Sequence, residues 1–383
     1  MTAFYDTGVD ESCTRASDFV TDATMKTKGT DRLITIFTPS FADEENTNAQ
    51  NLTVKEIVAR LPAEQFRVIM ICEGKSDPRI AARKNTKLLP YYRHGNTAQL
   101  LMRSLAFRPD IYFYPRFGPL DQAVFLLRKN LRLKTAVVAH IVSVMNNVAE
   151  KSLVARSIVE GDAVFANSAY VAETVQKRFG VGAETIYNGI DRRFFFCSDD
   201  PASIHSACPL TVLYAGSFRP LKRVELVIEQ ATRWPNVQFR LAGRGETEVC
   251  CRTLSRKYNC RNVSFLGHLP LAQLGEEMRR AHIFLFPSIV EGHPQVLGQA
   301  AACGLPAIAM NAYHPDYVSH GESGLLAESD TELSQYLDVL LRSSALRKSM
   351  ASAAARYSRQ FDWDRVAQQW AEVFQEVVAR QNT

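Results

Sequence analysis

Residues 286–309 (FPSIVEGHPQVLGQAAACGLPAIA) combine residue types that suit the recognition of a phosphate. Pro294 stands where a helix is expected to begin, and proline suits that position because its missing N–H would have no partner there. The next amides point out of a helix end that carries about half a positive charge. These amides belong to Gln295, Val296 and Leu297. We therefore expect a phosphate to bind at this end of the helix.

Two further residues of this segment favour a sugar beside that phosphate. Glu291 precedes Pro294 by three residues, and a carboxylate there would repel a phosphate. We interpret it as an acceptor of hydrogen bonds from hydroxyl groups. Gln299 lies one turn further along the expected helix and can bond another hydroxyl group.

A second segment, residues 214–223 (YAGSFRPLKR), is rich in cations. An apolar run ends in a turn at Gly216, and Arg219, Lys222 and Arg223 then enter an expected helix. Cations at the start of a helix are electrostatically unfavourable. Their presence indicates an anion that offsets the cost, and two anion-seeking loops in one half of the chain indicate a nucleotide diphosphate.

Both segments follow short apolar runs that alternate with helical patterns. In the first half the expected strands are residues 33–37, 67–72, 111–114, 135–139 and 163–165. In the second half they are residues 210–214, 238–241, 263–266, 283–286 and 307–309. Such alternation predicts parallel sheets covered by helices on both faces. Ligands of these sheets bind beyond the C-terminal ends of the strands, which is where both segments lie.

The pattern predicts an α/β protein of two Rossmann-like domains. The expected divisions are a disordered lead-in (1–31), a first Rossmann-like domain (32–190), a turn-rich linker (191–209), a second Rossmann-like domain that binds the nucleotide diphosphate (210–360) and a C-terminal helix (361–383).

The composition is that of a globular protein and excludes several classes. Of 383 residues, 46% are hydrophobic and 22% charged, which excludes collagen-like chains and wholesale disorder. The net charge is +5, with +7 on residues 32–190 and +1 on residues 191–383. We expect no nucleic acid partner and favour an anionic ligand for the first domain.

Targeting features indicate a cytoplasmic protein. No stretch approaches the roughly 20 apolar residues of a membrane span, and the eight cysteines form no CxxC pair, so we expect free thiols and no metal site. A basic run at residues 126–134 (LLRKNLRLK) has two interpretations. It suits peripheral contact with anionic lipid at the inner face of a membrane, or it is a solvated helix end, which we favour.

The segment PS-x-x-EG-x-P-x5-A-x-ACG-x-P resembles the C-terminal signature of the retaining GT-B glycosyltransferases of group 1 (GT4). Further matches follow in that family's order at residues 216–222, 241–246 (LAGRGE), 263–270 (VSFLGHLP), 320–326 and 361–370. In the first half, residues 166–180 and 187–195 resemble the family's link between its domains. The resemblance implies a central cleft between the domains and a C-terminal helix that crosses back to the first.

The resemblance also implies roles for residues of the second domain. Lys222 matches the lysine that holds the donor pyrophosphate, whereas Ser217 stands where the family has an arginine, so that Arg219 or Arg223 would have to substitute. Glu291 matches the first glutamate of an E-x7-E motif, which contacts the donor sugar. Gln299 replaces the second glutamate, which holds the ribose hydroxyls.

Two histidines and one loop complete the implied site. His140 matches a histidine that faces the donor sugar, and His268 falls in the loop against the nucleobase. The family's Gly-Gly loop after the first strand is replaced by residues 38–51, which contain no glycine. Asn48 and Gln50 are candidates for bonding an acceptor there, although a solvated loop and helix cap is the interpretation that we favour.

The resemblance implies a retaining glycosyltransferase, of hexosyltransferase type, that needs neither metal nor cofactor. It would move a sugar from a nucleotide-diphosphate donor to a hydroxyl of a saccharide or lipid-linked acceptor, in cell-surface polysaccharide or glycoconjugate synthesis. The departures at Ser217 and Gln299 keep an alternative open, a degenerate GT-B scaffold that binds a nucleotide or partner without turnover. A GT-B epimerase or phosphorylase is a weaker alternative. A nicotinamide dehydrogenase is disfavoured because no G-x-G-x-x-G follows the first strand.

Overall fold

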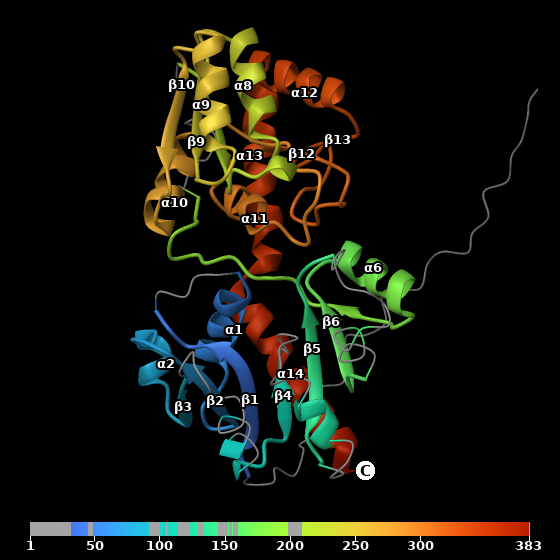
Figure 1. Ribbon diagram of the computed structural model, residues 1–383. Helices are drawn as coiled ribbons and strands as arrows, with labels where there is room; N and C mark the ends of the chain where they lie inside the picture. Colours follow the sequence, from blue (N-terminus) through green and yellow to red (C-terminus); the bar gives the residue numbers. More distant parts are fainter. Residues whose placement is uncertain are drawn as a thin grey trace, which may run out of the picture. The chain divides into compact units, whose positions relative to one another are not determined.

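The computed structural model describes residues 32–44, 49–91, 100, 102–103, 106–113, 123–128, 133–144, 152, 155, 160–197 and 209–382. Residues 33–383 form one compact unit, and Figure 1 labels its elements. The expected lead-in (1–31), Asn48, residues 198–208 of the expected linker and residues 129–132 of the basic run lie outside the described residues.

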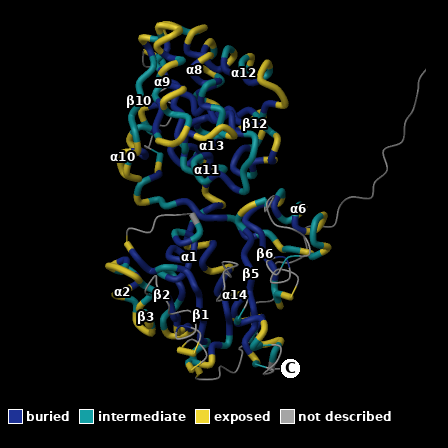
Figure 2. Tube along the Cα trace, in the orientation of Figure 1, coloured by how far each residue is buried: buried dark blue, intermediate teal, exposed yellow. Residues whose placement is uncertain are grey.

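The first sheet has seven strands in the order β3-β2-β1-β4-β5-β6-β7, and every neighbouring pair is parallel. The strands are β1 (Ile34–Phe41), β2 (Phe66–Cys72), β3 (Thr86–Pro90), β4 (Ile111–Phe113), β5 (Ala136–Ile141), β6 (Ala163–Ala166) and β7 (Glu184–Thr185). The five strands expected in this half are confirmed, and β3 and β7 are additional. Figure 2 shows the central strands β1 and β5 as buried, which explains why their sequences read as continuous apolar runs.

The second sheet has six parallel strands in the order β10-β9-β8-β11-β12-β13. They are β8 (Thr211–Ala215), β9 (Gln238–Ala242), β10 (Val263–Gly267), β11 (Ile283–Phe286), β12 (Ala307–Met310) and β13 (Gly324–Ala327). The sequence predicts the first five of these, and β13 is additional. Both sheets place β1 or β8 centrally, with the chain crossing over it, as a Rossmann-like sheet does.

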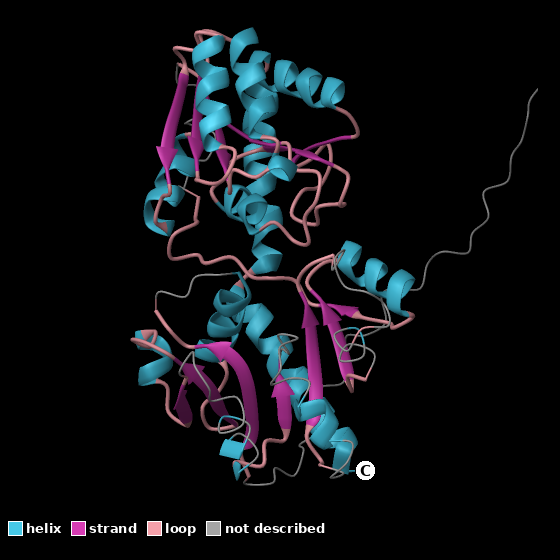
Figure 3. Cartoon of the chain, viewed as in Figure 1, coloured by secondary structure: helices cyan, strands magenta, loops and turns pink. Residues whose placement is uncertain are grey.

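Helices connect the strands in both halves, which confirms the expected alternation (Figure 3). The helices of the first half whose whole span lies within the described residues are α1 (Ala49–Arg60), α2 (Pro78–Ala82) and α6 (Ala169–Phe179). Those of the second half are η1 (Pro220–Lys222), α8 (Val224–Arg233), α9 (Glu248–Lys257), α10 (Leu271–Arg280), α11 (Gln295–Ala302), α12 (Asp330–Arg342), α13 (Ser344–Tyr357), η2 (Ser358–Phe361) and α14 (Trp363–Asn382). No helix of the described residues is long and apolar enough to span a membrane.

The last helix, α14, follows the second sheet in sequence but packs on the first. Trp370 is fully buried, and its ring lies 4.9 Å from that of Phe113 and 5.1 Å from that of Phe165. Phe374 adds an edge contact with Phe66 at 6.1 Å. These residues belong to one apolar cluster that includes β1, β2, β4 and β5. The expected return of the C-terminal helix to the first half is therefore confirmed.

The chain passes between the two halves twice, and the two passages are hydrogen-bonded. The N–H of Ile190 donates to the carbonyl of Phe361 at 2.7 Å, and Ile190 pairs with Asp362 in an isolated parallel bridge. Gly189 lies so close to the indole of Trp363 that an added Cβ would be 2.4 Å from Cδ2. A glycine is required here because the two passages touch.

The close approach predicts that Gly189→Ala destabilises the protein. Overpacking of this kind costs about 1–3 kcal/mol of unfolding free energy. Urea unfolding followed by circular dichroism measures the loss. Gly182→Ala is the matched control, because the added Cβ would meet only the Gln176 side chain at 3.7 Å. Equal stability of the two variants would contradict the packing that we describe.

Candidate functional site

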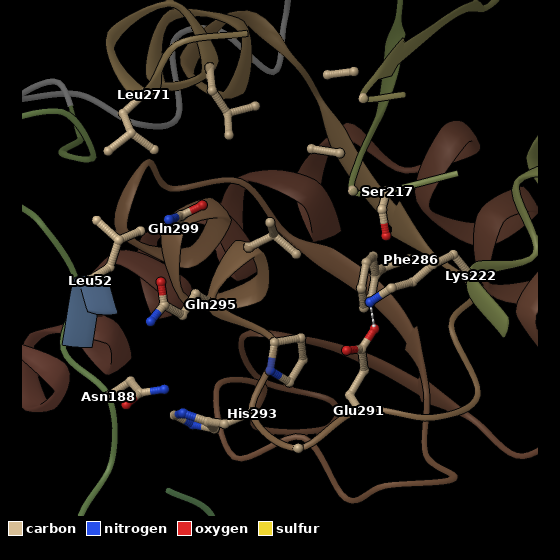
Figure 4. Close-up of a pocket in the computed structure, with 18 of the residues that line it drawn as sticks. Leu52, Asn188, Ser217, Lys222, Leu271, Phe286, Glu291, His293, Gln295 and Gln299 are labelled. Carbon is tan, nitrogen blue, oxygen red and sulfur yellow. Dashed lines mark hydrogen bonds and ion pairs between the residues drawn. The ribbon is translucent and has the colours of Figure 1, made fainter. Parts of the chain in front are cut away.

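A cavity of about 750 Å³ is lined by loops that follow strands of both sheets (Figure 4). From the second sheet it takes Gly216 and Ser217 after β8, Gly243 and Arg244 after β9, His268 after β10, and the stretch from Glu291 to Val296 after β11. From the first half it takes Leu52, Thr53, Val142, Asn167 and Asn188. This is the position at which parallel sheets bind ligands.

The two segments that the sequence singles out meet in this cavity. Lys222 and Glu291, 69 residues apart, form an ion pair between Nζ and Oε1, drawn as a dashed line in Figure 4. The N–H of Ile289 donates to the Leu221 carbonyl at 3.1 Å, which holds the loop of Glu291 against η1. Lys222 Nζ also lies 5.4 Å from the centre of the Phe286 ring. Backbone and side chain therefore both fix this pair.

The loop of Glu291 is also tied to the first half. Ser168 caps the start of α6, where its hydroxyl accepts from the N–H of Val171 at 3.1 Å. The same hydroxyl donates to the carbonyl of Gly292 at 2.8 Å. A second tie joins the hydroxyl of Tyr317 to the carbonyl of Asn188 at 2.8 Å. These bonds hold residues of the first half at the edge of the cavity.

Helix α11 begins one residue later than expected, with Pro294 as its N-cap. Among the described residues, the amides of Gln295 and Val296 have no backbone acceptor, as is usual in the first turn of a helix, and both residues line the cavity. The expectation for Leu297 is wrong. Its N–H donates to the Pro294 carbonyl at 3.0 Å, because the first turn closes on itself, and this amide is therefore already bonded. Its side chain packs in the apolar core of the second half.

Several buried polar atoms that line the cavity have no hydrogen-bond partner within the described chain. They are Nδ1 and Nε2 of His293, Nε2 of Gln295, Oε1 of Gln299 and Oδ1 of Asn167. An unsatisfied buried polar group costs about 1–3 kcal/mol. Such a set of donors and acceptors matches a ligand with several hydroxyl groups, and it includes the predicted Gln299.

His293 is a lining residue that the sequence argument missed, although it stands between Gly292 and Pro294 in the quoted signature. Its ring stacks on that of Tyr317, with 3.9 Å between centres. Burial, together with a smaller effect of the neighbouring His140, lowers the pKa of His293 to about 3. The imidazole is therefore neutral at pH 7 and can both donate and accept a hydrogen bond.

His140 does not line the cavity. It lies on β5 with 3% of its surface exposed, and its ring meets that of Trp370 edge to face at 5.0 Å between centres. Burial lowers its pKa to about 3. The residue expected to face a sugar thus lies beneath the cavity wall, because α14 covers the end of its strand.

Of the other predicted residues, some line the cavity and others lie outside it. Gly216, Pro294 and His268 line the cavity, and His268 is exposed on the loop after β10. Gln50 lies on α1 outside the lining, where Leu52 and Thr53 stand instead. Among the described residues, no group of three or more His, Cys, Asp or Glu side chains is arranged to hold a metal ion.

Neither arginine expected to substitute at Ser217 lines the cavity. Arg219 is exposed at the start of η1. Arg223 has a left-handed backbone conformation (φ 54°) and forms an ion pair with Asp330 at the start of α12. Arg244, which lies in the LAGRGE segment (241–246), lines the cavity instead. The position of a side chain after a strand end is set by neighbouring loops, which the local sequence does not show.

Two family models match the chain. Residues 201–357 match the group 1 glycosyl transferases, and residues 50–194 match glycosyltransferase family 4. The first match contains Lys222, Glu291 and Gln299, and the second contains His140 and α6.

Several curated relatives are glycosyltransferases of distant sequence. An uncharacterised glycosyltransferase of Methanocaldococcus jannaschii is 25% identical over 56% of this chain and 60% of its own length. D-inositol 3-phosphate glycosyltransferase of Streptomyces bingchenggensis is 24% identical over 57% of this chain and 53% of its own length. The matches span less than two thirds of these relatives.

Solved structures match the fold across most of the chain. Sucrose-phosphate synthase from Thermosynechococcus elongatus superimposes with a TM-score of 0.73 at 18% identity, covering 91% of this chain and 100% of that one. HepE of Anabaena, solved in complex with UDP, superimposes with a TM-score of 0.73 at 17% identity. The match covers 90% of this chain and 100% of HepE. The chain therefore has the GT-B fold.

The two buried histidines predict a pH dependence of stability. Their folded pKa values lie near 3, below the ordinary 6.5, so the unfolded state binds more protons once the pH falls below 6.5. Stability is then lost as pH falls from 6.5 toward 3, by about 1.4 kcal/mol per pH unit for each histidine. Urea unfolding between pH 7 and pH 5 should show that His293→Gln and His140→Gln each remove one such contribution. Variants that lose stability as steeply as the wild type would refute the assignment.

Proposed function

We propose that this GT-B chain, both halves of which match glycosyltransferase families, is a retaining glycosyltransferase of hexosyltransferase type. It moves a sugar from a nucleotide-diphosphate donor to a hydroxyl of a saccharide or lipid-linked acceptor. The observation that carries the proposal is the Lys222–Glu291 pair, set beside the start of α11 in a cavity at the strand ends.

Lys222 and the start of α11 bind the diphosphate. The ammonium group and the amides of Gln295 and Val296 all face the same cavity. Together they offset the negative charge that grows on the diphosphate as its bond to the sugar breaks. Stabilisation of developing charge by fixed donors is usually the largest contribution to catalysis. Helix amides and a lysine perform this role without a metal ion.

Glu291 binds the donor sugar once the diphosphate has taken over Lys222. The carboxylate then accepts hydrogen bonds from sugar hydroxyls and lies near the carbon that becomes positively charged. Gln299 bonds the ribose hydroxyls through its amide, and the neutral His293 bonds a further hydroxyl. The unpartnered polar atoms of His293 and Gln299 thus meet hydroxyl groups of the ligand.

Transfer proceeds with retention at the anomeric carbon. The bond from this carbon to the diphosphate oxygen breaks, the bond to the acceptor oxygen forms on the same face, and the acceptor proton passes to the departing phosphate. Glu291 is the one carboxylate among the described residues that line the cavity, and it faces Lys222. This supports proton removal by the leaving group, because a separate carboxylate base or nucleophile has no other candidate in that part of the chain.

The relatives support the donor class. HepE of Anabaena is solved in complex with UDP-glucose as well as UDP. The first half, with its net charge of +7 over residues 32–190, suits an anionic acceptor. We propose a role in cell-surface polysaccharide or glycoconjugate synthesis, in the cytoplasm.

A second candidate is a nucleotide-binding GT-B module without turnover. The observation that favours it is the pair of departures from the family's pattern, Ser217 and Gln299, both at the cavity wall. Such a module would bind the nucleotide and lack transfer or hydrolysis of its sugar. Both candidates therefore predict that the nucleotide binds, and only the transferase predicts turnover of the sugar donor.

Binding and turnover are tested with UDP, GDP and ADP and their glucose conjugates. A ligand at one hundred times its dissociation constant adds about 2.7 kcal/mol to the unfolding free energy. We expect one nucleotide to raise the melting temperature of the wild type. Lys222→Ala should abolish the rise because it removes the cation for the diphosphate. Glu291→Gln should keep it but lower sugar release or transfer by about 10²–10³-fold.

Lys177→Ala is the matched control, since Lys177 is an exposed lysine of α6 that pairs only with Glu173 of the same helix. It should leave both measurements unchanged. No melting shift with any nucleotide at millimolar concentration would refute both candidates. A shift without sugar release or transfer would leave only the binding module.

A further inference from the structure

The proposed donor site has a shortage of positive charge. Two phosphate groups must be held, yet Lys222 faces the carboxylate of Glu291 in the same cavity. Ser217, which lines the cavity where the resemblance implies an arginine, carries no charge. This inference rests on the proposed function and asks which residue supplies the second cation.

The two arginines nearest in sequence are placed elsewhere. Arg219 is exposed and lies outside the cavity lining. Arg223 is paired with Asp330, which stands in the first turn of α12. Neither side chain stands at the cavity wall.

Arg244 lines the cavity from the next strand of the sheet. It follows β9, which pairs with β8 on one side and β10 on the other. Its guanidinium lies over Gly267 at the end of β10, where Nε and Nη2 are each 3.5 Å from the place that a Cβ would take. Among the described residues no carboxylate pairs with Arg244, so its charge remains available to a ligand.

The loop of Arg244 is held directly against the loop of Ser217. The N–H of Phe218 donates to the Arg244 carbonyl at 2.9 Å, and the N–H of Gly216 donates to the Ala242 carbonyl at 3.0 Å. A Cβ on Gly243 would lie 1.8 Å from the Gly216 carbonyl oxygen, so only glycine allows this approach. The backbone therefore brings Arg244 beside the position of the missing arginine.

We propose that Arg244 is the second diphosphate-binding cation, taking the place of an arginine at position 217. With Lys222 on one loop and Arg244 on the next, the two phosphates meet cations from two adjacent strand ends. A guanidinium binds phosphate through two parallel N–H donors, which the lysine cannot do. The proposal assigns to Arg244 a contact with the phosphates and not with the base.

Arg244→Gln is the direct test, with calorimetric titration of the nucleoside diphosphate that the wild type binds and of the matching nucleoside. Loss of a charge-assisted bond should weaken diphosphate binding by about 10- to 100-fold. Nucleoside binding should change less than about twofold, because it involves no phosphate. The affinity for the diphosphate should also fall less steeply as the salt concentration rises, since one ionic contact is removed.

Arg219→Gln is the matched control, an exposed arginine of the neighbouring loop that should leave both affinities unchanged. A rescue variant distinguishes the loss of a phosphate contact from a folding defect, because only the former can be restored by a second guanidinium. Ser217→Arg placed in the Arg244→Gln background should restore most of the diphosphate affinity, because it puts a guanidinium back at the same phosphates.

Three outcomes would overturn the proposal: wild-type diphosphate affinity in Arg244→Gln, an equal loss for nucleoside and diphosphate, or a loss confined to Arg219→Gln. Each of these leaves the proposed function standing, because the wild type still binds the nucleotide. A wild type that binds no nucleoside diphosphate overturns both proposals, and this result is distinguished by the wild-type titration alone.

Discussion

The site depends on an ion pair between two loops that are distant in sequence. Lys222 and Glu291 follow β8 and β11, which are neighbours in the sheet, so the fold brings the loops together before any side chain is considered. A largely buried ion pair contributes little to stability, because desolvation of both charges offsets their attraction. Its retention in a cavity is better explained by binding, in which an anion takes the lysine and a hydroxyl-bearing group takes the glutamate.

The first sheet and α14 form a second constraint that acts on the same cavity. Trp370 fills the space at the end of β5 and thereby buries His140. The neighbouring His293 reaches the cavity instead, stacked on Tyr317. Both imidazoles are kept neutral by burial, so the apolar packing of one helix decides which histidine can meet a ligand and in which protonation state it does so.

The sequence predicts the parts of the site that depend on local pattern. Lys222, Glu291 and Gln299 stand in loops or helices directly after apolar runs, so their approach follows from sheet topology alone. Other positions depend on contacts between distant segments, which local pattern cannot show. His140 is covered by a helix that begins more than 200 residues later, and Arg223 is drawn to Asp330 of α12. The amide of Leu297 is taken by a backbone bond within the first turn of α11, which the expected helix start does not show.

The strand-end loops also explain how charge can change place without loss of the site. The loops after β8, β9 and β10 are joined by backbone bonds, from Gly216 to Ala242 and from Gly243 to the Gly267 carbonyl. Their relative position is therefore set by main-chain atoms and small residues, and not by the side chains they carry. A cation on one loop can compensate for a neutral residue on the neighbouring loop, because residues of both loops line the same cavity. Ser217 and Arg244 stand in that relation to each other.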